Sequence, residues 1–176
     1  MSLGILFIIA VGLSMDAFSL SLIYGTLNIK NKYQYMMSIF VGIFHFFMPL
    51  LGYFIGKIIF SIVPINPEIV AGVIFIVLSL EMLISLKKEE PLTIFESIPS
   101  VLLFAFTVSI DSFSIGIGLG NLTNNIYIAS FIFSMTSALF TYCGLKLGNL
   151  LVNKFGSIAT IIGSIILLLL GIYYIF

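Results

Sequence analysis

The sequence predicts an all-α integral membrane protein whose six transmembrane helices form two inverted three-helix repeats. Composition is the first observation, because 61% of the 176 residues are hydrophobic and 8% are charged, whereas a soluble domain carries about 25% charged residues. The second is a series of six apolar segments, each long enough to cross a bilayer core of about 30 Å. The third is a polar motif that occurs twice. We expect one membrane domain over residues 1–176, with no room for a soluble catalytic domain.

The six apolar segments follow one another with only short breaks between them. They run approximately over residues 3–24, 35–60, 67–86, 98–119, 127–147 and 155–176. Each is close to the length of about 20 residues that a spanning helix needs. The breaks contain Asn, Lys, Pro and Gly, which favour loops. The first segment is predicted to be a permanent helix, because the sequence around it shows no basic region and no small-residue cleavage site of a secretory signal.

Lysines predict the orientation, because positively charged loops stay in the cytoplasm. Six of the seven basic residues fall in or beside the first, third and fifth breaks, and the seventh, Lys57, lies on the other side. The six are Lys30, Lys32, Lys87, Lys88, Lys146 and Lys154. We therefore expect these breaks to be cytoplasmic and both termini to face outward. The formal net charge of 0 gives no indication of a nucleic-acid partner.

The repeated motif places one carboxylate in the middle of each of two apolar segments. Asp16 lies in GLSMDAFS and Asp111 in TVSIDSFS, at an offset of 95 residues. Because residues four and seven positions apart share a helix face, each of the two helices is predicted to carry one narrow polar stripe. The stripes consist of Gly12, Asp16 and Ser19 in the first segment and of Thr107, Asp111, Ser114 and Gly118 in the fourth.

The repeat extends into the second and fifth segments as matched glycine pairs, which let helices approach closely. Gly52 and Gly56 recur as Gly144 and Gly148, at an offset of 92 residues. Three segments per repeat is an odd number, so the second repeat crosses the membrane in the opposite direction to the first. We expect repeat one to cover about residues 1–90 and repeat two about residues 91–176, an inverted arrangement that is typical of transporters.

Both carboxylates are predicted to lie in the central third of the bilayer. Each is 13 residues from the start of its segment, roughly 20 Å at 1.5 Å per residue. An ionised Asp at that depth costs about 2.5–3.5 kcal/mol, and intramembrane acids mostly mark ion or proton pathways. The alternative is that each Asp is protonated, or bonds to the serines beside it, and only joins helices.

Two carboxylates with nearby hydroxyls form a set of oxygen ligands, which suits a hard divalent cation. Mn²⁺, Mg²⁺ or Ca²⁺ fits such an oxygen set better than Zn²⁺ or Cu⁺. The candidate hydroxyls are those of Ser14, Ser19, Thr107, Ser109, Ser112 and Ser114. Ser14 and Ser109, each two residues before its Asp, are also candidates for lining an ion pathway.

His45, Pro49 and Glu81 are further polar or helix-distorting residues inside apolar segments. His45 precedes Pro49 by four positions, and proline leaves the carbonyl of that residue without its helical donor. His45 is therefore either a hydrogen-bonded residue at a kink or an ion ligand. Glu81 is either a second acid on an ion pathway or a residue that reaches the cytoplasmic headgroups.

The stretches GLSMDAFSLSL, HFFMPLLGYFIG and SIDSFSIGIG resemble the MntP family of bacterial manganese efflux pumps. The resemblance covers essentially the whole chain, and its most specific feature is the pair of motifs around Asp16 and Asp111. It implies a multi-pass protein of the bacterial cell membrane that exports Mn²⁺ from the cytoplasm and needs both aspartates. Mn²⁺ would be the transported substrate, and no cofactor is implied. The family typically has Gln where His45 stands here.

Two other classes of function stay open. A sister family of sporulation-associated membrane proteins shares the aspartate motifs, and membership of it would make the chain a non-transporting interaction protein. A membrane-embedded enzyme is the weakest alternative, because the sequence has neither a nucleophile–base pair nor a nucleotide-binding loop. If the chain is a transporter, we expect it to exchange protons for metal, since carboxylates can release a bound cation when they are protonated. His45 would then be a candidate modulator of this exchange.

Overall fold

The computed structural model is a bundle of helices. It describes residues 2–27, 29–64, 66–86, 97–120, 122–123 and 125–176, and of residues 85 and 149–157 the backbone alone. The helices are α1 (Leu3–Gly25), α2 (Asn31–Ile62), α3 (Pro67–Ser85), α4 (Ile98–Gly118) and α5 (Ile126–Ile175). These ranges contain no strand, and the predicted all-α class is confirmed.

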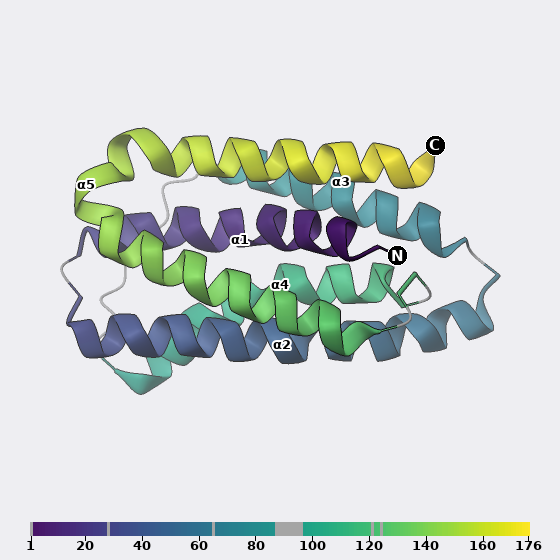
Figure 1. Cartoon of the computed structure of the whole chain (residues 1–176), viewed down its shortest axis with the longest axis horizontal. Helices are drawn as coiled ribbons and strands as arrows, with labels where there is room; N and C mark the ends of the chain where they lie inside the picture. The colour runs from purple at the N-terminus through teal and green to yellow at the C-terminus, as the bar shows by residue number, and fades with distance from the viewer. Residues whose placement is uncertain (1, 28, 65, 87–96, 121, 124) are drawn as a thin grey trace.

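Six stretches of these helices are long and apolar enough to cross a membrane, as the sequence predicts. α5 supplies two of them, Ile126–Gly148 and Ile158–Ile175. Figure 1 shows that the green first half of α5 runs to one end of the bundle, turns there, and returns as the yellow second half. Between the fifth and sixth apolar segments the sequence predicts a loop over residues 149–156, and this prediction is wrong, because the backbone stays helical there. A helical turn keeps its peptide groups hydrogen-bonded to one another, which an apolar surrounding favours.

The two ends of the bundle differ in what they contain. Both chain ends lie at one of them, which we call the terminal end, and the α1–α2 connection and the turn of α5 lie at the other, the turn end (Figure 1). At the turn end Lys146 donates a hydrogen bond to Asn31, with 2.7 Å between Nζ and Oδ1. Lys87, Lys88 and the side chain of Lys154 lie outside the described residues. A cytoplasmic turn end therefore stays a prediction.

Polar residues fix where four of the helices begin. The side chains of Ser2, Asn66, Ser97 and Asn125 each accept a hydrogen bond from a backbone N–H in the first turn of α1, α3, α4 and α5, respectively. The first N–H groups of a helix have no partner within the helix. These caps therefore satisfy donors that would otherwise be left at the ends of the membrane spans.

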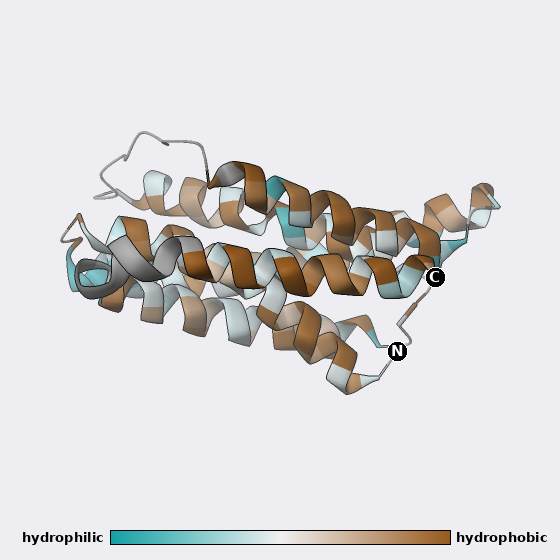
Figure 2. Cartoon of the chain, turned by 90° about the horizontal axis from the view of Figure 1, so that it is seen from above, coloured by the Kyte–Doolittle hydropathy of each residue, from teal (hydrophilic) through white to brown (hydrophobic). Residues whose placement is uncertain are grey.

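The outside of the bundle is apolar along most of its length. Figure 2 shows mainly hydrophobic residues along the helices, with hydrophilic residues gathered chiefly near the two ends. Phe47, Leu103 and Leu169 are among the large apolar side chains that are more than half exposed. Such surfaces are stable against lipid tails, whereas water would drive them together. The arrangement is that of a multi-pass membrane protein surrounded by the bilayer.

Glycines bring the helix backbones together in the same way in both halves of the chain. A Cβ on Gly148 of α5 would collide with the carbonyl oxygen of Leu22 in α1, and one on Gly56 of α2 would collide with that of Ile117 in α4. The same holds one turn away, where Gly144 faces the carbonyl of Phe18 and Gly52 faces that of Phe113. The contact partners are spaced by the offsets of the sequence repeat, 95 residues for α1 and α4 and 92 for the glycines.

α2 continues as a helix through Pro49, whose backbone packs directly on α4. A Cβ on Gly116 would collide with the carbonyl oxygen of Pro49. Proline cannot donate to the carbonyl four residues earlier, which is that of His45. The absence of a side chain on Gly116 therefore lets α4 lie close to the interrupted stretch of α2.

We predict that Gly56→Ala and Gly148→Ala each lower the stability of the folded protein, because the added methyl group meets a carbonyl oxygen of the neighbouring backbone. Overpacking of this kind costs about 1–3 kcal/mol. Thermal unfolding of the detergent-solubilised protein measures the effect. Gly4→Ala is the matched control, since the nearest atom to its new Cβ would be Ser2 Oγ at 4.0 Å. Equal unfolding temperatures for all three variants would contradict the close approach.

Candidate functional site

The two repeated aspartates lie on separate helices and interact through their charges. Asp16 is on α1 and Asp111 on α4, and both side chains are partly buried. The charges that act on Asp111 are those of Asp16 and of Glu81, which is on α3. α1 and α4 themselves share few close contacts. Three helices therefore bring carboxylates into electrostatic range of one another, although their sequence positions are far apart.

Both aspartates point away from the interfaces that hold α1 on the first half of α5 and α4 on α2. Ser14 bonds to Ser137 in the first half of α5, with 3.0 Å between the hydroxyl oxygens. Ser109 bonds to His45 in α2, with 2.8 Å between Oγ and Nδ1. Residues two positions apart on a helix point about 200° apart, so each Asp lies on the face opposite its serine. We call these faces of α1 and α4 the carboxylate faces.

The second half of α5 covers the carboxylate face of α1. Thr160 donates a hydrogen bond to Ser19, with 2.7 Å between their oxygens. A Cβ on Gly163 would lie 2.7 Å from that of Met15 and 3.0 Å from the carbonyl oxygen of Gly12. The stripe of α1 predicted from the sequence is therefore packed along its length against one neighbouring helix.

The stripe of α4 is covered only in part. Gly118 packs on Ala71 of α3, with 3.0 Å between an added Cβ and the Ala71 Cα. Ser114 is half-buried, one turn from Asp111. Thr107 is exposed, and its hydroxyl donates to the carbonyl of Leu103 in its own helix at 2.9 Å. The structure therefore keeps Ser114 beside Asp111 but does not bring Thr107 to the same place.

His45 is fully buried and belongs to a different interface. Its Nδ1 lies 3.0 Å from the carbonyl oxygen of Val41 and 2.8 Å from Ser109 Oγ, on the side of α4 opposite Asp111. Among the described residues, no three His, Cys, Asp or Glu side chains come close enough together to hold a metal ion. The structure therefore shows a hydrogen-bonded histidine beside Pro49 and does not gather His45 with the carboxylates.

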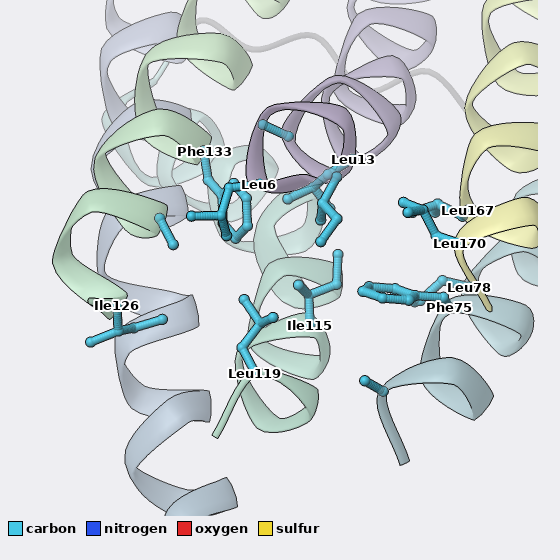
Figure 3. Close-up of a cluster of buried hydrophobic side chains, with 14 of the residues drawn as sticks. Leu6, Leu13, Phe75, Leu78, Ile115, Leu119, Ile126, Phe133, Leu167 and Leu170 are labelled. Atoms are coloured by element: carbon cyan, nitrogen blue, oxygen red, sulfur yellow. The ribbon is translucent and has the colours of Figure 1, made fainter. Parts of the chain in front are cut away.

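An apolar cluster fills the space next to the aspartates on the terminal side. In Figure 3 side chains from α1, α3, α4 and α5 point toward one another. The cluster includes Leu6, Leu13, Phe75, Ile115, Leu119 and Leu167. Leu13 lies one turn from Asp16 and Ile115 one turn from Asp111, each toward the terminal end. We call these residues the terminal-side cluster.

Glu81 lies toward the turn end, on the side of the aspartates that faces away from the terminal-side cluster. It follows the buried Leu78 by three residues in α3, which runs toward the turn end, and its side chain is exposed. The terminal-side cluster thus lies next to the carboxylate faces toward the terminal end, whereas a third carboxylate lies toward the turn end, beside Met82 of the same apolar core.

Two residues that the sequence did not single out complete these contacts. Ser137 occupies the position that matches His45 at the 92-residue offset of the glycines, so the repeat itself could have identified it. Thr160, the partner of Ser19, carries no such signal, because the bond depends on how the second half of α5 returns along α1.

Comparison with known proteins finds one family model and several relatives that match most of the chain. A family model described as "Mntp: Putative manganese efflux pump" matches residues 27–175. The chain is 35% identical over 170 residues to the "Putative manganese efflux pump MntP" of Bacillus pumilus (strain SAFR-032), which covers 96% of this chain and 92% of the relative. It is 31% identical over 170 residues to the protein of that name from Geobacillus thermodenitrificans (strain NG80-2), covering 96% and 93%. No solved structure matches the chain.

Proposed function

Because the chain belongs to the Mntp family, we propose that it is a secondary transporter that exports Mn²⁺ or a similar divalent cation from the cytoplasm. The observation that carries the proposal is the placement of Asp16 and Glu81 within electrostatic range of Asp111, inside a bundle of membrane-spanning helices. A divalent cation is the natural counter-charge, since α1 and α4 contain no Lys or Arg. Lipid surrounds the protein, and the cation is its substrate.

Asp16 and Asp111 are the proposed ligands, with Ser19 and Ser114 as neighbouring hydroxyls. Carboxylate and hydroxyl oxygens suit Mn²⁺, which keeps part of its water shell in sites with few protein ligands. Each serine lies three residues from its Asp, on nearly the same helix face. Thr107 and His45 are left out of this proposed set, because the first is exposed and the second lies on the far side of α4.

The cation is proposed to enter from the turn end, with Glu81 on its path. The terminal-side cluster covers the site toward the termini, whereas Glu81 is exposed on the opposite side. If the turn end is cytoplasmic, Glu81 lies on the cytoplasmic side of the aspartates and the terminal-side cluster on the outer side. Export then requires the terminal-side cluster to part. The matched glycine contacts of the two halves support a rocking of one repeat against the other.

We predict that Asp16→Asn and Asp111→Asn each abolish resistance to excess Mn²⁺. Loss of a charged ligand lowers affinity by about tenfold or more, because contacts to charged groups are the strong ones. The measurement is growth of an exporter-deficient bacterium that makes comparable amounts of each variant. Ser19→Ala and Ser114→Ala should have smaller effects.

Thr107→Ala is the matched control for these variants, since it changes the same stripe of α4 at an exposed position. It should leave resistance at the level of the unaltered chain. Full resistance in either asparagine variant would rule out the two-aspartate site.

Export also needs an energy source, which we propose to be protons that enter in exchange. Moving one charge across 100 mV is worth about 2.3 kcal/mol, so a divalent cation leaving an inside-negative cell costs about twice that before any concentration gradient. Six spans and short connections take up the 176 residues, and an ion gradient is an energy source that needs no further domain. Protonation of Asp16 and Asp111 from the outer side would release the metal, and deprotonation on the inner side would prepare the site again.

We predict that metal flux in reconstituted vesicles acidifies the compartment that donates the metal. An imposed proton gradient should accelerate the flux, and a protonophore should remove that acceleration at constant voltage. A pH-sensitive dye and a metal-sensitive dye in the same vesicles give both readings. Asp111→Asn vesicles serve as the background. A rate of metal flux that changes with neither the proton gradient nor the protonophore would disprove proton coupling.

A further inference from the structure

A second polar track runs through the bundle, away from the carboxylate faces. In the first half of α5, Ser130, Ser134, Ser137 and Thr141 recur at spacings of four, three and four residues, which places them on one helix face. From Ser130 to Thr141 they span 11 residues, roughly 16 Å of helix. This length is about half of a bilayer core.

Polar side chains of three other helices face this stripe or continue it. Ser14 of α1 bonds to Ser137. Gly42 of α2 packs on Ser134, with 3.3 Å between an added Cβ and the Ser134 carbonyl oxygen. His45 lies one turn further along α2 and bonds to Ser109 of α4. Toward the turn end the track continues with Ser21, Gln34 and Ser38, all of them buried. We call this set, together with the α5 stripe, the polar column.

The polar column contains most of the buried polar atoms that no protein group satisfies. Six such side-chain atoms occur among the described residues, and five of them lie in the column. They are Ser21 Oγ, Gln34 Oε1, His45 Nε2, Ser130 Oγ and Thr141 Oγ1. A buried polar atom without a partner is costly, and native proteins commonly satisfy such atoms with ordered water.

His45 defines the kind of partner that is missing. The carbonyl oxygen of Val41 can only accept, so the ring proton is on Nδ1. Ser109 donates its own proton to the carbonyl of Ala105 and therefore accepts from the same Nδ1. Nε2 is left as a buried acceptor that needs a donor. Serine and threonine hydroxyls can turn to a carbonyl of their own helix, but neither Nε2 nor Gln34 Oε1 can be satisfied in that way.

We propose that the polar column holds a chain of water molecules, which supplies the partners that these buried atoms lack. Water bound at Nε2 donates to the ring and accepts from its neighbour in the chain. Ser14 and Ser109 place the column on the opposite side of α1 and α4 from the two aspartates, so the water is separate from the proposed metal site.

The protein sequence contains one histidine, His45, which allows a direct test of whether the polar column holds water. With ¹⁵N-labelled histidine, the membrane-embedded protein gives one pair of ring-nitrogen signals in solid-state NMR. We expect a protonated Nδ1 and an unprotonated Nε2 that receives magnetisation from water. A ring without transfer from water to Nε2 would overturn the hydrated column, whether or not the protein transports metal.

Discussion

Close approach of helix backbones at glycine is the constraint on which the rest of the structure depends. In lipid there is no hydrophobic gain from bringing two apolar helices together, so association relies on packing and on hydrogen bonds between helices. Gly148 against α1 and Gly56 against α4 supply the packing. Because they draw the helices together on one face, the serines of that face can bond across the interface, as Ser14 and Ser109 do.

The same constraint divides the polar residues of each motif between two faces. A motif of alternating polar and apolar residues, placed on a helix, sends its serine and its aspartate in opposite directions. The serine joins one pair of closely packed helices, and the aspartate is directed toward the other side, where α3 and the second half of α5 lie. A short sequence thus carries one structural and one chemical role at neighbouring positions. This division explains why a buried histidine and two partly buried carboxylates occur so near one another without forming one cluster.

The sequence was sufficient for the features that depend on hydropathy and local spacing. The six spans and the all-helical class follow from apolar length, and the position of each Asp follows from counting along a helix. Thr107 shows the limit, because it shares a stripe with Asp111 but is exposed in the structure. The role of His45 depends on Ser109, 64 residues away, and the bond of Ser19 to Thr160 spans 141 residues. Such contacts are set by how helices cross, which no local pattern records.

The interface of α1 with the first half of α5 and that of α4 with α2 have matching backbone contacts but different side chains. Where α2 offers an imidazole to Ser109, the first half of α5 offers a hydroxyl to Ser14. Rocking that exchanged the environments of the two halves would therefore not return a state of equal energy, as it would in a chain of identical repeats. In the proposed transport cycle, a preference for one side of the membrane would then depend in part on His45 and Ser137, which lie away from the carboxylates.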